Sequence, residues 1–143
     1  MMTNAVEGAA ITKDSVQRIA EILIQVSDPG RSLRFYRDGL GLLFAPTSYG
    51  DGSFETKVGE VRLLLHPDFD DSLRSIKRGA GVLIHLWVPD ADAYCAQVRR
   101  RGIPVLDEPD DRPWGRHFSV VDPDGYRIDI LGPLKDAAAF TAS

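Results

Sequence analysis

The chain has 143 residues, 43% of them hydrophobic, and a net charge of −4 with acidic and basic residues mixed along it. This length suits one domain with its own core, while the lack of a basic block excludes a nucleic-acid footprint and no apolar run approaches the roughly 18 residues of a membrane helix. Because segment 1–14 lacks the pattern of a secretory signal and the single cysteine, Cys95, cannot form an intramolecular disulfide, we expect a soluble cytoplasmic protein.

The first structured segments predict a strand followed by a helix. Residues 22–26 (ILIQV) are rich in β-branched and apolar side chains, as strands are. Residues 27–29 (SDP) then offer an oxygen-bearing cap and a proline whose missing N–H costs nothing at a helix start. Apolar side chains recur at helical spacing as far as Leu40, where glycines close the helix. A second strand is predicted over residues 59–65 (GEVRLLL).

The same pattern returns in the second half of the chain. Residues 82–88 predict a strand at a spacing of 62 residues from the first one, and the following cap and helix run as far as Gly102. Residues 125–131 predict a last strand, which follows residues 59–65 at a spacing of 66 and is preceded by the turn sequence DPDG. Two similar units in one chain are the sequence signature of an internal repeat. The alternative is an ordinary α+β domain whose halves agree by chance.

The repeat divides the chain into five parts. We predict an N-terminal arm over residues 1–18, a first unit over 19–66 and a linker over 67–80. A second unit then covers residues 81–134 and a tail covers 135–143, so that residues 19–134 form a single domain.

Two motifs carry a family resemblance. Residues 26–41 resemble the opening strand and helix of glyoxalase-like proteins, with the pattern D…S..FY...LG, and residues 114–128 resemble their closing WG…DPDG hairpin. Together the likeness spans roughly residues 20–133. The chain thus resembles the vicinal oxygen chelate superfamily of glyoxalases, bleomycin resistance proteins and dioxygenases. The resemblance implies an α+β fold of two βαβββ modules, which form a curved, cup-shaped mixed sheet and pair across a homodimer.

The resemblance leaves the function open, because one fold serves several chemistries. Metal-dependent members act as lyases, isomerases or dioxygenases and line the cup with His, Gln or Glu ligands. Bleomycin-resistance members lack the metal and sequester a drug in the same cup. The resemblance places the four ligand positions at Glu21, Leu63, Leu83 and Asp129. Since leucine has no lone pair and zinc, nickel and iron favour three or more protein ligands, we expect no metal cofactor.

The cup nevertheless keeps residues with useful chemistry. Strand alternation directs Glu21, His85 and Asp129 toward it, and these are the candidate catalytic residues. If a divalent metal is bound after all, the same three residues are its ligands. The candidate ligand-binding residues are Gln25, Leu63, Leu83, Trp87, Trp114, Arg116, Phe118 and Arg127.

Three functions therefore remain. The first is a metal-free protein that binds or sequesters a small, partly aromatic organic ligand on flat aromatic walls. The alternative is a metal-dependent lyase, isomerase or dioxygenase that uses Glu21, His85 and Asp129. A third is a metal-free enzyme in which Glu21 or Asp129 is a general acid or base; against it, each carboxylate can instead pair with an arginine such as Arg116 or Arg127 in a purely structural network.

Overall fold

The computed structural model describes residues 13, 14, 16, 18–68 and 82–140. Module one contains β1 (Ile22–Val26), α1 (Pro29–Leu33), η1 (Arg34–Gly39), β2 (Ala45–Pro46), β3 (Phe54–Val58) and β4 (Val61–Pro67). Module two contains β5 (Ile84–Trp87), α2 (Ala91–Arg100), β6 (Val105–Arg112), β7 (Gly115–Val121) and β8 (Arg127–Gly132), followed by the 3₁₀ helix η3 (Ala137–Phe140). Most of the predicted arm 1–18 and linker 67–80 lies outside the described residues, among which no helix is long and apolar enough to cross a membrane.

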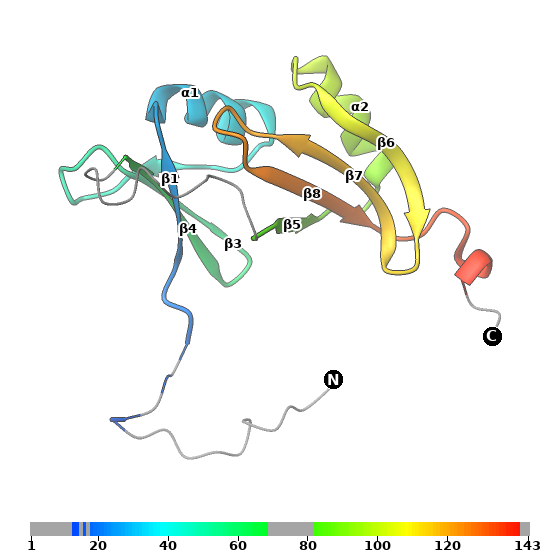
Figure 1. The fold of residues 1–143 in the computed structure, drawn as a ribbon, viewed down its shortest axis with the longest axis horizontal. Helices are drawn as coiled ribbons and strands as arrows, with labels where there is room; N and C mark the ends of the chain where they lie inside the picture. Colours follow the sequence, from blue (N-terminus) through cyan, green and yellow to red (C-terminus); the bar gives the residue numbers. More distant parts are fainter. Residues whose placement is uncertain (1–12, 15, 17, 69–81, 141–143) are drawn as a thin grey trace.

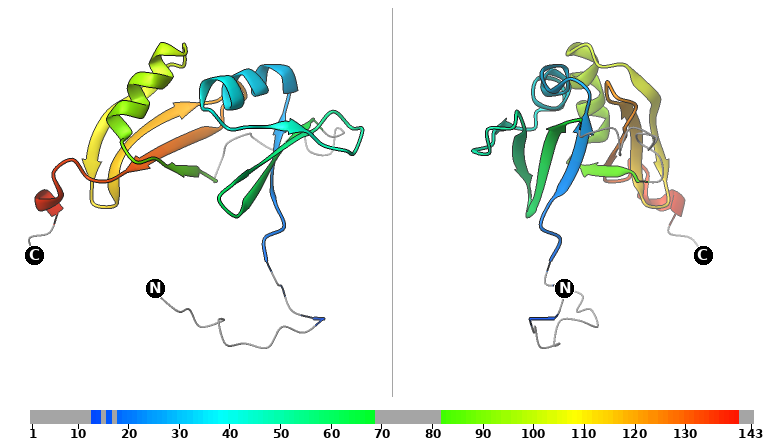
Figure 2. Two further views of the ribbon diagram at one scale, coloured as in Figure 1. Left: turned by 180° about the vertical axis from the view of Figure 1, so that it is seen from behind. Right: turned by 60° about the vertical axis from the view of Figure 1, so that its left-hand side comes forward.

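The two modules have the same topology. Each forms a four-stranded sheet, with strand orders β1-β4-β3-β2 and β5-β8-β7-β6. In each sheet the first and last strands of the module pair in parallel, and the remaining neighbours pair antiparallel. The helices α1 and α2 lie on the same side of the strands, and β6 and β7 curve along their length (Figures 1 and 2). The prediction of an α+β fold with two βαβββ modules is therefore confirmed.

Each helix begins as its sequence predicts. The carboxylate of Asp28 accepts a hydrogen bond from Arg31 N at 3.3 Å, and that of Asp90 accepts one from Ala93 N at 3.0 Å. Both acidic side chains thus satisfy an N–H that the helix leaves unpaired. The first helix continues from α1 into the π-helical segment η1.

One continuous core lies between the helices and the sheets. Both modules contribute to it, and none of the following side chains is more than 4% exposed: Ile24, Val26, Leu63, Leu65, Cys95, Val98, Phe118, Val120, Ile128 and Ile130. Since successive side chains of a strand point to opposite faces, the alternate residues lie on the other side of each sheet. We call this side, away from the helices, the open face.

Hydrogen bonds tie the first helix to the second module. The hydroxyl of Tyr36 donates to Asp122 at 2.7 Å, inside the core. Asp122 opens the predicted DPDG turn, where its side chain also accepts from the backbone N–H groups of Asp124 and Tyr126. At the surface Ser27 Oγ donates to Asp124 at 2.6 Å. The turn that closes module two is thereby held against the helix that opens module one.

The strand register corrects one prediction. Ile22 lies opposite Leu63 in module one, as Ile84 lies opposite Ile128 in module two. Leu63 is therefore the counterpart of Ile128 at a spacing of 65 residues, not 66, and its side chain points into the core. The prediction that Leu63 faces the cup is wrong. The run Leu63–Leu65 has no polar residue to reveal its alternation, and the predicted spacing of 66 residues is one residue too long. The true counterpart of Asp129 is Leu64.

Candidate ligand-binding site

The open face of module two combines charged and apolar side chains. Strands β5, β8 and β7 lie side by side, and His85 is opposite Asp129, which is opposite Ser119. Residues opposite one another on paired strands share a face. Counting along each strand from this row gives the full set: Leu83, His85 and Trp87 from the β5 segment, Arg127, Asp129 and Leu131 from β8, and His117, Ser119 and Val121 from β7.

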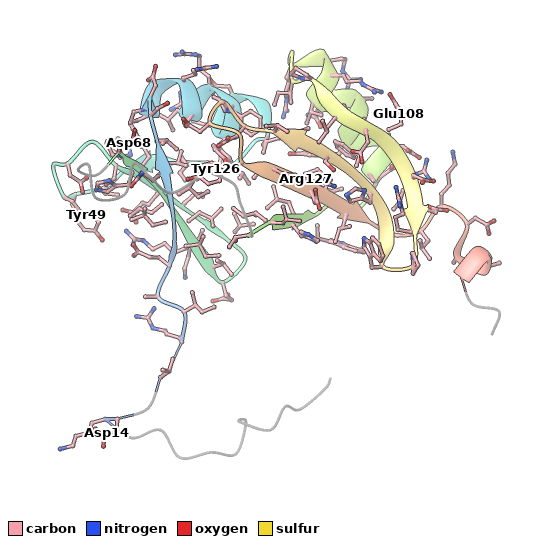
Figure 3. The ribbon with its side chains drawn as sticks, viewed as in Figure 1. Asp14, Tyr49, Asp68, Glu108, Tyr126 and Arg127 are labelled. Atoms are coloured by element: carbon pink, nitrogen blue, oxygen red, sulfur yellow. The ribbon has the colours of Figure 1, made fainter. Side chains whose placement is uncertain are left out.

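Asp129 is the centre of a polar cluster on this face. Its side chain is only 5% exposed. Arg127 Nε donates to Asp129 Oδ1 at 2.7 Å, and Arg127 itself lies on β8 (Figure 3). The other carboxylate oxygen, Oδ2, lies 3.3 Å from His85 Nε2 and 3.5 Å from His117 Nε2. Ser119 Oγ lies 3.3 Å from the same nitrogen of His117. Two imidazoles and a guanidinium thus surround one buried carboxylate.

The neighbours of Asp129 keep it ionised. Burial by itself raises the pKa of the Asp129 carboxyl, but hydrogen bonds from Arg127 and Ser119 and the charge of Arg127 outweigh burial, so this pKa lies below its usual value. The hydrogen bond to Asp129 in turn raises the pKa of the Arg127 guanidinium. The cluster is therefore a formed ion pair with two histidines beside it.

Exposed apolar side chains frame this cluster. Trp87 is 63% exposed, Leu83 49% and Val121 40%, whereas His85 at the centre is 44% exposed at its side chain. Large apolar groups that stay exposed in a group commonly mark a binding surface. This part of the open face can therefore stack a flat molecule and offer it a polar contact.

The open face of module one has a separate polar cluster. Arg62 forms an ion pair with Glu21, and its Nη2 lies 3.3 Å from Glu55 and 3.0 Å from the hydroxyl of Tyr49. These hydrogen bonds, above all the one to Glu55, raise the pKa of Arg62. Among the candidate catalytic residues, the structure brings His85 and Asp129 together, whereas Glu21 is paired with Arg62 on the other sheet.

The residues at the four metal positions that the resemblance implies do not fit a divalent ion. With the corrected register these positions are Glu21, Leu64, Leu83 and Asp129, so that two of the four are still leucines. Glu21 and Asp129 are each already paired with an arginine. Within residues 18–68 and 82–140, no three His, Cys, Asp or Glu side chains are grouped so that they could hold a metal ion.

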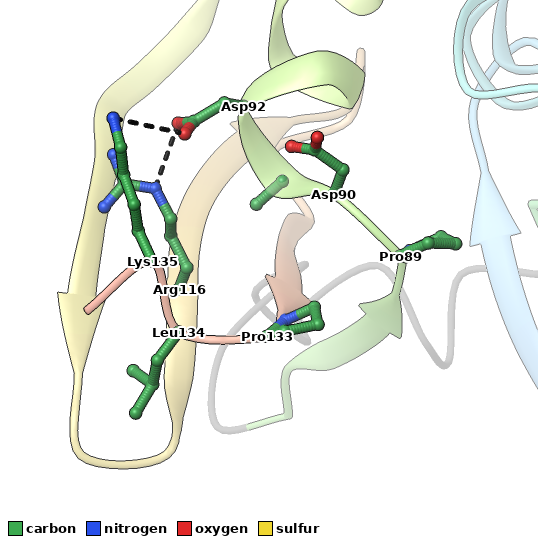
Figure 4. Close-up of a pocket in the computed structure, with 8 residues that line it drawn as sticks. Pro89, Asp90, Asp92, Arg116, Pro133, Leu134 and Lys135 are labelled. Carbon is green, nitrogen blue, oxygen red and sulfur yellow. Dashed lines mark hydrogen bonds and ion pairs between the residues drawn. The ribbon is translucent and has the colours of Figure 1, made fainter. Parts of the chain in front are cut away.

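Two other placements predicted from sequence are wrong. Phe118 does not line the cup: it is fully buried on the helix side of β7, where its ring centroid lies 6.3 Å from that of Tyr94. Arg116 has the same parity and binds Asp92 at 3.0 Å and Asp111 at 3.1 Å. It lines a shallow depression of about 330 Å³ at the start of α2, which includes Lys135 but neither His85 nor Trp87 (Figure 4).

Trp114 and Gln25 are the last two of the predicted ligand-binding residues. Trp114 is 61% exposed in the turn before β7. Its neighbour Gly115 lies beside Trp87, since a Cβ on Gly115 would be 3.9 Å from Trp87 Cζ3. Gln25 is on the open face of module one, and its carbonyl accepts a hydrogen bond from the hydroxyl of Tyr126.

Two members of the cluster, His117 and Ser119, are not among the site residues predicted from the sequence. The signal was present, because His117 and Ser119 alternate with the apolar Phe118 and Val120 along β7. That alternation places the apolar pair on the helix side and the polar pair on the open face.

The fold defines a protein built from two βαβββ modules. A family model described as the Glyoxalase/Bleomycin resistance protein/Dioxygenase superfamily matches residues 18–130. The chain belongs to this superfamily.

Solved structures give the same assignment. The chain is similar to TnmS3, an antibiotic binding protein from Streptomyces sp. CB03234, with 27% identity, a TM-score of 0.68, and coverage of 83% of this chain and 98% of that one. It is also similar to a glyoxalase/bleomycin resistance protein from the same Streptomyces strain, with 28% identity, a TM-score of 0.59, and coverage of 78% and 99%. A protein from Nocardioides at 20% identity shares the fold, with a TM-score of 0.64 and coverage of 87% and 89%. No match to the chain is found among curated proteins.

Proposed function

We propose that this protein binds a small organic molecule with a planar aromatic part on the open face of module two, without a resident metal. The observation that carries the proposal is the exposure of Trp87, which remains 63% accessible beside the charged cluster of Asp129. The likeness to TnmS3, described as an antibiotic binding protein, supports a ligand of this kind.

The exposed area of Trp87 indicates how much its burial can contribute to the binding free energy. An aromatic side chain can bury about 150–250 Å². With 63% of Trp87 still accessible, roughly 100–160 Å² is open to a ligand, and at about 25 cal/mol per Å² its burial contributes about 3 kcal/mol. That contribution alone changes an equilibrium constant roughly a hundredfold.

The proposed site also includes a second copy of the chain. The open faces of both modules carry partly exposed apolar residues, among them Leu23 at 38% and Leu83 at 49%. We propose that two chains pair so that the open face of one module faces that of another and encloses the ligand. A reducing compartment such as the cytoplasm suits the protein, since the thiol of Cys95 is free and buried.

A binding experiment tests the proposal. We expect planar aromatic compounds, antibiotics among them, to quench tryptophan fluorescence and to raise the melting temperature of the wild type. Trp87→Ala should weaken binding about a hundredfold. The matched control is Leu43→Ala, which removes another exposed apolar side chain, 81% accessible, from a loop of module one. Equal weakening in both variants, or none in Trp87→Ala, would place the ligand elsewhere.

Two further measurements test the metal and the dimer. Protein purified without chelator should contain no stoichiometric divalent metal by elemental analysis; one firmly held ion per chain would contradict the metal-free proposal. Light scattering should give twice the mass of one chain. A stable monomer would contradict the shared enclosure.

A further inference from the structure

The contact between His85 and Asp129 determines which nitrogen of a neutral His85 ring carries the proton. His85 Nε2 faces Asp129 Oδ2 at 3.3 Å, and the side chain of His85 is still 44% exposed. An ionised carboxylate can only accept hydrogen bonds. A bare imidazole nitrogen at this position would set one lone pair against another, so the proton of the neutral ring belongs on Nε2.

The surroundings of Asp129 support this tautomer. The low pKa of the Asp129 carboxyl, held down against burial by Arg127 and Ser119, keeps the carboxylate negative. His117 reaches the same oxygen from β7, and Asp107 on β6 lies 4.0 Å from His117 Nδ1. Arg127 balances the charge of Asp129. The pair of Asp129 and Arg127 therefore carries no net charge, so that a ligand beside it can be recognised by hydrogen bonding.

A neutral ring with its proton on Nε2 has one acceptor left, which is Nδ1. We propose that His85 Nδ1 accepts a hydrogen bond from a hydroxyl group of the ligand, so that the site selects planar phenols or enols over their ethers. This inference rests on the proposed binding function and adds the chemical class of the ligand. His85 is then a specificity-determining residue, and Asp129 positions it.

Trp87 sets the shape of such a ligand. It stands two residues beyond His85 on the same face. Two residues along a strand span about 7 Å. A ring that stacks on Trp87 therefore reaches His85 best when the hydroxyl sits on a fused or extended aromatic system. A single small phenol spans this distance poorly.

A matched pair of fused-ring compounds tests the inference. 7-Hydroxycoumarin donates a hydrogen bond at pH 7, and 7-methoxycoumarin has the same rings without the donor. A neutral hydrogen bond contributes about 1 kcal/mol, so we expect the wild type to bind the hydroxyl compound about fivefold more tightly. His85→Phe keeps a flat ring but removes the acceptor, and the preference should vanish. His85→Asn returns an acceptor atom on Cγ, where Nδ1 is attached, and should restore part of the preference.

The outcomes distinguish a failure of this inference from a failure of the proposed function. Equal binding of both coumarins by the wild type, or a preference that persists in His85→Phe, overturns the role of His85. If Trp87→Ala still weakens binding in that case, the proposed function stands. If the wild type binds neither coumarin, the assigned ligand class is wrong, and the broader compound screen decides the proposed function separately.

Discussion

Replacing Tyr36 by phenylalanine tests the link between the two modules. Tyr36 is 1% exposed and Asp122 4%, and the hydroxyl of Tyr36 donates to the Asp122 carboxylate at 2.7 Å. A hydrogen bond to a charged group contributes about 1.5–3 kcal/mol. Asp122 keeps the backbone N–H bonds of Asp124 and Tyr126 in the variant, so it is not left without partners. We therefore expect a loss in the lower half of this range, about 2 kcal/mol.

Urea unfolding at neutral pH measures this loss. The midpoint should fall with no change in slope, because the surface exposed on unfolding stays the same. At roughly 2–4 °C per kcal/mol for a chain of this size, the melting temperature should fall about 4–8 °C. Tyr94→Phe is the control, since Tyr94 donates at 2.6 Å to a neutral acceptor, the carbonyl of Leu40, and should cost about 1 kcal/mol. A Tyr36→Phe protein within about 0.5 kcal/mol of wild type would refute the reasoning.

Three further changes test the faces, the charges and the turns. Phe118→Ala, in the core, should destabilise the protein by about 3–5 kcal/mol in urea unfolding, whereas Leu83→Ala, 49% exposed on the open face, should stay within about 0.5 kcal/mol; the reverse order would mean that the faces are misassigned. Because the pKa of Asp129 is lower in the folded than in the unfolded protein, its stabilising effect is present above the unfolded pKa near 4 and is lost as pH falls through the folded pKa. Arg127→Met should therefore lower stability more at pH 7 than at pH 3, and a pH-independent difference would contradict this. Gly115 and Gly125 both have positive φ, but only at Gly115 would a new Cβ meet backbone, 2.8 Å from the Gly132 carbonyl oxygen. Gly115→Ala should therefore lower the melting temperature more than Gly125→Ala does. Equal melting temperatures would argue against this contact.

The elements with local signals were predictable from the sequence. The caps Asp28 and Asp90 and the DPDG turn reflect interactions within a few residues, and the structure confirms them. β6 gave no such signal, because its sequence VLDEPDDR contains a proline and acids and its pairing with β7 shifts register twice. It is a strand because β7 beside it offers unpaired backbone groups, which the sequence of β6 alone cannot show.

The candidate site was predictable only in part for a related reason. His85, Asp129 and Trp87 follow a clear alternation in β5 and β8, and they do share a face. Leu63 was misplaced by one residue because the run Leu63–Leu65 is uniformly apolar, and a slip of one residue exchanges the two faces of a strand. The partner of Glu21 was also out of reach, since Arg62 lies 41 residues away and becomes its neighbour only through the parallel pairing of β1 with β4.

Module one has a leucine at the position that Asp129 occupies in module two, and this difference allows the role of Asp129 to be tested. Leu64 fills the equivalent place in module one at 3% exposure, so this position of the fold accepts a leucine. Replacing both members of a buried ion pair by apolar residues is often neutral or stabilising, whereas removing one member is costly only where the other charge stays buried. In Asp129→Leu the released Arg127 side chain, already 40% exposed, can extend into water. We expect the free energy of unfolding to stay within about 1 kcal/mol of wild type. The preference for hydroxylated over methoxylated coumarin should weaken, because Asp129 no longer holds the proton of His85 on Nε2. A strongly destabilised Asp129→Leu protein would mean that the cluster maintains the fold, and an intact preference would mean that Asp129 does not position His85.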